Sequence, residues 1–487
     1  MSISSTLSNA LSGLTSSARR ADVVSSNIAN AMTDGYGTRR LETVSRMLGN
    51  NGSGVRVAGV TRHEDAVLTG QRRLAEAEMG AARRQVDFAK RLETLIGTPD
   101  QPGSLSGRIA DFEASLIAAS NAPWNTTTLT GAVQSAQAMV DTINGISEGI
   151  QDERHRADTE IGRAVGRINS ALEGLADLNK RILSTQPNSG EMAALLDSQA
   201  QLVEQIAPFI PLQSRRDTNG TLQLYSNDGH VLLSHRAMKL GFDQAPGMDP
   251  FVSLANGNIS GLSLDGRPLR LDGSNPAFHG GELSALFEIR DVLGPEAQAR
   301  MDAVARDLAE RFDETGLDTT IAVGDPGLFT DAGTIVDPLN EVGLAGRLKL
   351  NSAVVPSEGG AVWRLRDGLA ATAEGPTGDN SFLSAQIAAL AAQRTTLSGG
   401  FTPTTRSVAG LASETLSLAS LSRITGEATL SHTSNLHSVL KTSELANGVD
   451  TDDELQRLLK IEQAFAANAR VINVAEELMD ELMRIAQ

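Results

Sequence analysis

The sequence predicts a mainly α-helical protein with a smaller β-rich insertion, and three observations support this fold class. Apolar residues repeat every seven positions over residues 3–31, and a similar repeat covers residues 458–486. Ala- and Leu-rich segments with helical spacing fill most of the chain between these ends. Only residues 208–280 change to the alternating pattern of strands. The expected architecture is a helix-rich body with an inserted antiparallel β unit and an amphipathic helix at each end.

The N-terminal repeat predicts the a/d seam of a coiled coil. Apolar side chains recur at steps of three and four residues, and Ser17 is the one polar residue in the series. The members are Ile3, Leu7, Ala10, Leu14, Ala21, Val24, Ile28 and Ala31. The other residues are mostly Ser, Asn and Thr, which are poor helix formers. We therefore expect this helix to be ordered only when a partner covers its seam.

The C-terminal repeat has the same form, with Asn468 in its polar position. The members are Leu458, Ile461, Phe465, Ile472, Ala475, Met479, Leu482 and Ala486. Three acidic residues at 452–454 predict the start of this helix, because carboxylates are stabilised near a helix N-terminus. Both ends of the chain are thus predicted to be helices with an apolar seam.

The region between the two ends is predicted to be largely helical. Breaks rich in Pro and Gly separate its segments. Helices are expected at 64–96, 104–120, 126–184, 189–207 and 280–315, and again from 361, with a break at 396–407. Residues 316–358 are rich in Gly, Asp and Pro and predict a mixed segment.

The β unit is predicted from its turns. Asn219-Gly220, Asp228-Gly229 and Asp265-Gly266 each separate alternating apolar and polar residues. Such pairs favour the tight turns of β-hairpins. Residues 208–280 should therefore form a small antiparallel unit.

The composition excludes several classes of function. The net charge is −17, whereas nucleic acids and anionic membrane surfaces attract basic proteins. The chain has no cysteine, which excludes disulfides and thiolate metal sites. No apolar run approaches the length of about 18 residues that predicts a membrane span, and no cleaved secretory signal is visible. We expect no nucleic-acid partner, no membrane insertion, and either a cytosolic protein or export that does not use such a signal.

No catalytic constellation is found in the sequence. Phosphate-binding loops, nucleophile elbows, zinc-binding helices and calcium loops are all missing. The seven histidines are scattered, and we expect them at the surface or at helix ends; they are His63, His155, His230, His235, His279, His432 and His437. We therefore predict that the protein is not an enzyme, with no catalytic residues, no cofactor and no metal.

One stretch near the end of the first helix, SSNIANAMTDGYGTRR (25–40), is unusual. Asn27 and Asn30 can be amides on a solvent-facing surface near a helix end, with Gly35 as the helix stop. This interpretation leaves Tyr36, one of only two tyrosines, unexplained. Alternatively, the amides face neighbouring subunits, because helices rich in small residues approach closely and amides can then bond one another.

This stretch resembles the N-terminal signature of bacterial flagellar axial proteins, Asn-Asn-Ile-Ala-Asn-x-x-Thr-x-Gly-Tyr/Phe. Ser26 replaces the first Asn, and Gly37 stands where Thr, Ser or Lys is usual. The matching residues that we single out are Asn27, Asn30, Thr33, Gly35 and Tyr36. At the other end, QAFAANARVI (463–472) is similar to the closing helix of the family. The resemblance covers about 70 residues, at the two ends of the chain and in the family's order.

The resemblance implies a fold and a function. The two terminal helices pair as a coiled coil, and subunits stack around a central channel with these helices innermost. The protein has no catalytic role, and binding is its function. The long helical block and GGELSALFEIRD (280–291) resemble a member that joins the hook to the filament and templates filament assembly. The hook protein or a distal rod protein is the nearest alternative.

The resemblance also implies partners and a location. The partners are further copies of the chain, the hook protein, a second junction protein and an export chaperone. The location is extracellular, in the flagellum at the hook–filament junction, after export by the flagellar type III apparatus. On the residues alone, a hydrolase with coiled-coil ends or a cytosolic coiled-coil scaffold stays open, although no motif supports the first.

Three parts are expected. Residues 1–45 and 435–487 form the terminal coiled-coil assembly domain. Residues 46–207 and 281–434 form the helix-rich body, and residues 208–280 form the β-rich inserted domain.

Overall fold

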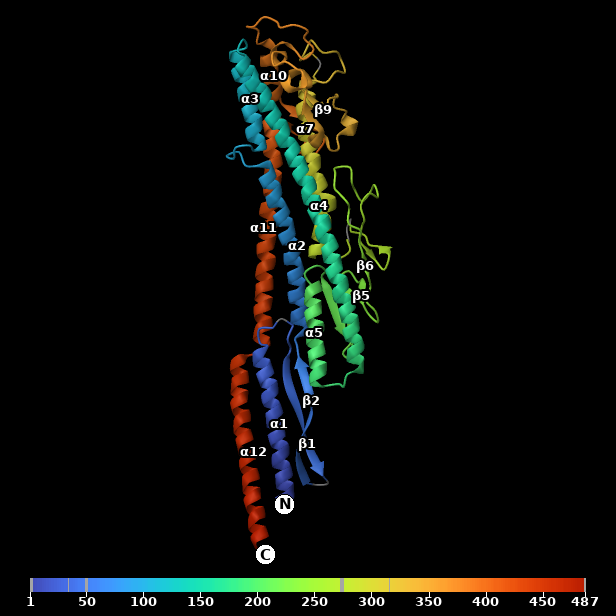
Figure 1. Cartoon of the computed structure of the whole chain (residues 1–487), viewed down its shortest axis with the longest axis vertical. Helices are drawn as coiled ribbons and strands as arrows, with labels where there is room; N and C mark the ends of the chain where they lie inside the picture. The colour runs from blue at the N-terminus through green and yellow to red at the C-terminus, as the bar shows by residue number, and fades with distance from the viewer. Residues whose placement is uncertain (1–2, 34, 49–50, 272–275, 315, 486–487) are drawn as a thin grey trace.

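The computed structural model describes residues 3–485 except 34, 49–50, 272–275 and 315. The molecule is an elongated rod, and both ends of the chain lie at the same end of it (Figure 1). The C-terminal seam position Ala486 lies outside the described residues. Helices dominate, and the sheets are small and antiparallel, which confirms the predicted fold class.

One end of the rod is built from both termini, and we call residues 3–63 and 451–485 the terminal section. Helix α1 (Ile3–Ala29) lies between helix α12 (Thr451–Ile485) and a β-hairpin (Figure 1). The two helices run in opposite directions along each other. The predicted pairing of the terminal helices is confirmed.

The hairpin of the terminal section consists of β1 (Thr38–Leu48) and β2 (Asn51–His63), paired antiparallel with two register shifts. Such irregularities bend and twist a two-stranded ribbon. Its position against α1 is not apparent from the sequence. The border expected at 45/46 falls inside β1, and the border expected at 434/435 falls inside helix α11 (Val408–Asn447).

Four helices of the body follow the expected segments closely. They are α2 (Ala66–Ile96), α3 (Leu105–Asn121), α4 (Thr126–Ser184) and α5 (Gly190–Ile206). Each begins after a side chain that accepts hydrogen bonds from the first turn, namely Asp65, Ser104, Asn125 and Ser189. Helix α4 spans most of the body and contributes the longest row of core residues.

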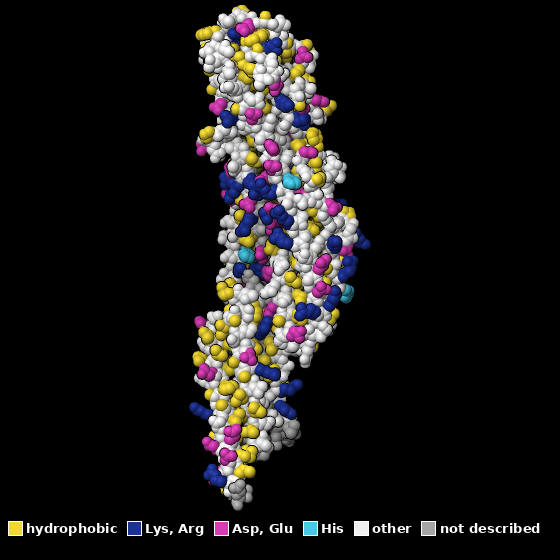
Figure 2. Space-filling model, in the orientation of Figure 1, with side chains coloured by type: hydrophobic (Ala, Val, Ile, Leu, Met, Phe, Trp, Pro, Cys, Tyr) yellow, Lys and Arg dark blue, Asp and Glu magenta, His cyan; other side chains and the backbone are white. Residues whose placement is uncertain are grey.

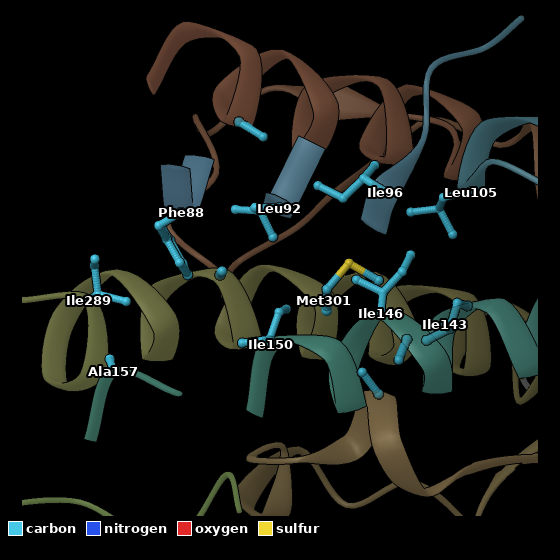
Figure 3. Packing of buried hydrophobic residues seen from close by; sticks show 14 of the residues in the cluster. Phe88, Leu92, Ile96, Leu105, Ile143, Ile146, Ile150, Ala157, Ile289 and Met301 are labelled. Carbon is cyan, nitrogen blue, oxygen red and sulfur yellow. The ribbon is translucent and has the colours of Figure 1, made fainter. Parts of the chain in front are cut away.

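The core of the body lies between α2, α4 and α7 (Gly294–Phe312). Figure 3 shows Leu92 and Ile96 facing Ile146, Ile150 and Met301 across this core. The segment expected at 280–315 forms α6 (Glu282–Glu288), one π-helical turn (Ile289–Leu293) and α7. Leu, Ile and Ala fill most of the core, in agreement with the low aromatic content.

The β unit contains two small antiparallel sheets. The first has the order β3 (Leu212–Arg216), β4 (Leu222–Ser226) and β5 (Val231–Leu233), and the second has the order β6 (Leu240–Gly241), β7 (Ser263–Leu264) and β8 (Arg267–Pro268). The predicted turns are confirmed, with Gly220 and Gly229 in the left-handed conformation. Buried Arg154 holds the unit on α4 by donating to the carbonyls of Asp249 and Val252.

The end of the rod opposite the termini is the mixed region. It contains β9 (Phe329–Asp331), α8 (Leu344–Arg347), β10 (Leu348–Leu350), α9 (Arg364–Asp367), α10 (Ser381–Ala391), β11 (Arg394–Thr395), β12 (Thr405–Arg406) and 3-10 turns at Pro338–Asn340, Ser352–Val354 and Pro356–Glu358. The helix expected to resume at 361 is short, since α9 has four residues. Helix α11 then returns along α2 to the terminal section.

Candidate assembly surfaces of the terminal section

The N-terminal seam lies within the single chain. Val24 is buried, as are Ala10 and Ser17. Four further seam positions are half-buried, namely Ile3, Leu7, Leu14 and Ile28. The seam therefore contacts α12 on one side and the hairpin on the other without becoming a closed core.

The C-terminal seam is less covered. Ala475 is buried, and Leu458, Ile461 and Ile472 are half-buried. Exposure is 41% for Phe465, 43% for Met479 and 52% for Leu482.

Further apolar side chains of α12 lie beside the seam in solvent. They include Leu455, Leu459, Val471, Val474, Leu478, Met483 and Ile485. Yellow side chains gather over this end of the rod in Figure 2. A contiguous apolar surface of this kind typically marks an interaction site.

Asn27 occupies a different environment from either of the two expected ones. Its side chain is fully buried and makes its bonds inside the chain. The amide nitrogen donates to the carbonyl of Arg39 (2.9 Å), and the amide oxygen accepts from the N–H of Arg39 (3.0 Å). The hydroxyl of Tyr36 donates to the same oxygen (2.9 Å). Asn27 thus links the end of α1 to the first residues of β1 by hydrogen bonds. Its side chain faces neither solvent nor a neighbouring subunit.

The other signature residues shape the turn between α1 and β1. Asn30 donates to the carbonyl of Ser26 (2.9 Å), and the Thr33 hydroxyl lies 3.5 Å from the Asn30 oxygen. Gly35 has φ of 80°, and a Cβ there would lie 3.3 Å from the Ala200 side chain. The backbone conformation therefore favours glycine, and the close approach of α5 leaves little room for a larger side chain.

Tyr36 has two roles in this turn. Its hydroxyl bonds Asn27, and its ring faces the guanidinium of Arg39 at 5.0 Å from the ring centroid. Such a cation–π contact adds to the packing of the ring. The rare tyrosine at the end of the signature is explained by these contacts within the chain.

Asp197 of α5 connects the terminal section to the body. Its carboxylate accepts from Arg39 (2.5 Å), Arg62 (2.8 Å) and the backbone N–H of Gly37 (3.1 Å). Arg62 also donates to the carbonyl of Gly35 (2.9 Å). No sequence signal identifies Asp197, because these three partners lie 158, 135 and 160 residues away in the chain.

A second ionic cluster holds the end of α11 on the body. Arg72 of α2 pairs with Glu444 of α11 (2.5 Å), Glu204 of α5 (2.6 Å) and Glu76 (2.8 Å). Burial alone would lower the pKa of Arg72, yet the hydrogen bond and charge of Glu204, with those of Glu444 and Glu76, raise it. Arg72 is therefore always charged and fixes α11 just before the start of α12.

Among the described residues, no group of three or more His, Asp or Glu side chains is placed to hold a metal ion. None of the described helices combines the length and apolar character needed to cross a membrane.

Three family models match separate parts of the chain. The model described as the helical domain of flagellar hook-associated protein FlgK matches residues 89–327. The flagellar basal body rod FlgEFG C-terminal model matches residues 446–485, and the flagella basal body rod model matches residues 7–36. The last two correspond to α12 and to α1 with its signature turn.

Curated relatives match over most of the chain. Flagellar hook-associated protein 1 of Bacillus subtilis (strain 168) is 23% identical over 94% of this chain and 93% of its own length. The protein of the same name from Escherichia coli (strain K12) is 23% identical over 99% of this chain and 100% of its own length. That of Salmonella typhimurium is 27% identical over 64% of this chain and 58% of its own length.

A solved structure, the flagellar hook junction protein FlgK from Burkholderia pseudomallei, aligns with a TM-score of 0.43 and 17% identity. The alignment covers 54% of this chain and 47% of that chain. The two ends of the chain match models of flagellar rod proteins, and the body matches a model of a flagellar hook-associated protein. The chain is thus similar to the bacterial flagellar axial proteins at both of its ends and, over most of its length, to flagellar hook-associated protein 1.

Proposed function

We propose that this protein is a structural component of the bacterial flagellum that joins the hook to the filament and provides the template on which the filament begins. The observation that carries the proposal is the uncovered apolar face of α12. The helix already pairs with α1, yet Phe465, Met479 and Leu482 stay more than 40% exposed. Neighbouring subunits would bury this face, and burial of apolar surface is the main favourable term in association.

The hook protein and a distal rod protein are weaker candidates. The models that match the two ends are described as basal body rod models, so these matches alone do not favour the junction role. The helical body matched at 89–327 favours the junction.

The partners and the location extend this proposal. The terminal section contacts other copies of the chain, the hook protein and a second junction protein, and an export chaperone accompanies the chain before export. The protein reaches the hook tip through the flagellar type III apparatus and acts without catalysis. The division into a terminal assembly domain, a helix-rich body and a β-rich insertion fits these roles, with the body and insertion outside.

A deletion strain tests the proposal. Cells without the protein should build complete hooks without filaments and release flagellin into the medium, because filament subunits need a template that the hook does not supply. Electron microscopy of the cells and analysis of the culture supernatant measure both effects. Normal filaments on the deletion strain would exclude the junction role.

A further inference from the structure

The terminal section divides its charge unevenly. Residues 1–63 carry seven arginines and three carboxylates, a net charge of +4 in a chain of net charge −17. The last turns of α12 have the opposite sign, with Glu476, Glu477, Asp480 and Glu481 near one basic residue, Arg484. One molecule therefore carries two complementary surfaces.

The basic surface surrounds a groove between α1, β1 and α12. The groove has a volume of about 410 Å³ and is lined by apolar Val23, Leu41 and Ile461. Arg20, Arg40 and Lys460 also line it and are exposed, and no ion pair between described residues engages them. The one carboxylate in the groove belongs to Glu454, which is 2% exposed and already paired with Arg457. The groove thus has an apolar floor and a positive rim without a counter-ion.

The last turns of α12 have the matching chemistry. Val474, Leu478, Leu482 and Ile485 follow one another at steps of three and four and are exposed. Successive positions at these steps lie on one side of a helix. Glu477 and Glu481 flank this apolar row and are exposed as well. An apolar helix edge bordered by carboxylates fits a groove with an apolar floor and basic rim.

The two surfaces cannot meet within one molecule. Lys460 borders the groove near the start of α12, and Glu477 lies 17 residues further along the same helix, about 25 Å away. A contact between them requires a second copy, displaced along the rod axis. Because the two surfaces differ, the contact is heterologous and repeats from copy to copy into a ring or helical array.

We propose that this groove, lined by Val23, Arg40, Leu41 and Lys460, binds the last turns of α12 from a second copy of the chain. The inference rests on the proposed function, since it specifies how copies contact one another at the junction. Rim charges set the register of the contact, and the apolar row is buried in the groove.

Cysteine cross-linking tests the contact directly, because the chain has no cysteine of its own. Arg40→Cys and Glu477→Cys chains are co-expressed in the deletion strain, and isolated hook–basal bodies are treated with a short bis-maleimide. A covalent dimer is expected for this pair. In the control, Arg40→Cys is paired with Arg267→Cys, an exposed residue of β8 in the β unit, and no dimer is expected.

The outcomes separate the inference from the proposed function. If both chains reach the hook and give no dimer, or the control dimerises equally, the groove contact is wrong while the junction role stands. An adduct with a protein of another mass shows that a different occupant fills the groove and also overturns it. Concentrated purified chains are cross-linked in parallel. If the chains do not reach the hook, that result counts against the junction role. The groove contact can then still be tested on the purified chains.

Charge reversal gives a second measurement. The double variant Arg40→Glu and Lys460→Glu should lower recovery in hook–basal bodies by about tenfold, and Glu477→Arg with Glu481→Arg should do the same, because like charges then oppose each other. Combining all four changes in one chain should restore recovery. Loss without restoration, in chains that keep the wild-type melting temperature, would contradict the pairing of these two surfaces.

Discussion

The buried amide of Asn27 shows how a single residue defines the end of a helix. It engages both backbone groups of Arg39 and the hydroxyl of Tyr36, so a strand starts directly after the turn that ends α1. Alanine at this position would leave the N–H and carbonyl of Arg39 without those partners. Unsatisfied buried polar groups cost about 1–3 kcal/mol each.

Asn27→Ala should therefore destabilise the terminal section by about 1–3 kcal/mol. Asn30→Ala is the matched control, because the Asn30 amide donates only to the carbonyl of Ser26 within its own helix end. Hydrogen exchange at the Arg39 amide measures the effect. Equal exchange in the two variants would show that the Asn27 bonds do not hold the turn.

The alternatives for Asn27 could not be decided from the sequence. Asparagine three residues from another asparagine is compatible with solvent, a neighbour or a strand, and the pattern contains no information about Arg39 twelve positions later. Gly35 was more informative, since a glycine after a helix predicts a left-handed turn, and its φ is 80°. The residue type of Gly35 thus predicts its backbone conformation, whereas the residue type of Asn27 does not predict which groups its side chain binds.

Asp313 at the end of α7 gives a pH-dependent prediction. Burial raises its pKa from 3.8 to about 6, against the hydrogen bond that it accepts from Gly327 N–H. The folded state therefore binds this proton more tightly than the unfolded chain, and stability falls as pH rises from about 4 to 6.

The charge penalty of Asp313 is complete above its folded pKa and disappears below its unfolded pKa. Asp313→Asn keeps an acceptor for Gly327 and removes the charge, so its melting temperature should exceed that of wild type more at pH 7 than at pH 4. Asp325→Asn, at an exposed turn carboxylate that also accepts a backbone N–H, is the control. A difference that does not vary with pH would contradict the role of burial.

At the scale of elements, helices were predictable and the hairpin was not. The boundaries of α2 to α5 lie within about two residues of the expected ones, because long apolar periods and Pro/Gly breaks carry the signal. In β1, residues 39–44 alternate between half-buried and exposed, but the half-buried side consists of Arg39, Leu41 and Thr43, so no alternating apolar face marks the strand in the sequence. The position of the hairpin depends on α1 and α5, which lie elsewhere in the sequence.

The half-covered state of α12 yields a prediction about Phe465. Truncating an aromatic residue in a packed site costs about 3–5 kcal/mol, but Phe465 is 41% exposed in the single chain. Phe465→Ala should therefore leave the melting temperature of the purified protein nearly unchanged and lower its recovery in hook–basal bodies. Glu462→Ala, one turn earlier and exposed, is the control.

Leu14→Asp on the facing helix should also impair recovery, since a carboxylate in the seam would be buried without a partner upon assembly. Leu14 is half-buried in the single chain, so a modest change in melting temperature is compatible with the assembly role. A variant that melts far below wild type yet still assembles would place these helices in the monomer core instead of the subunit interface.

At the scale of the whole molecule, two chain crossings connect the terminal section to the body, at 64–65 and 448–450. Contacts across this joint keep the two parts in line. Asp197 binds both strands of the hairpin, the carbonyl of Asn188 accepts from Val60 N–H (2.7 Å), and Arg72 fixes the end of α11. The joint is therefore largely polar. If the joint opens, the terminal section and the body each keep their own apolar contacts and can stay folded.

Asp197→Ala should open this joint without unfolding either part. The variant leaves Arg39 and Arg62 without their shared carboxylate, and hydrogen bonds to charged groups are worth about 1.5–3 kcal/mol each. Among the described residues, the side-chain hydrogen bonds of Asp197 go to Gly37, Arg39 and Arg62 of the terminal section, so the main melting transition of the body should move little.

Small-angle X-ray scattering measures the opening. The maximum dimension and its spread should change in Asp197→Ala, because the terminal section then pivots about its two chain crossings. Asp177→Ala is the control, since Asp177 pairs with Lys180 on an exposed face of α4, where such pairs contribute about 0–1 kcal/mol. If Asp197→Ala scatters like wild type, the two chain crossings and Arg72 are enough to keep the rod straight. If the main melting temperature of the variant falls far below that of wild type, the joint is part of the folding core.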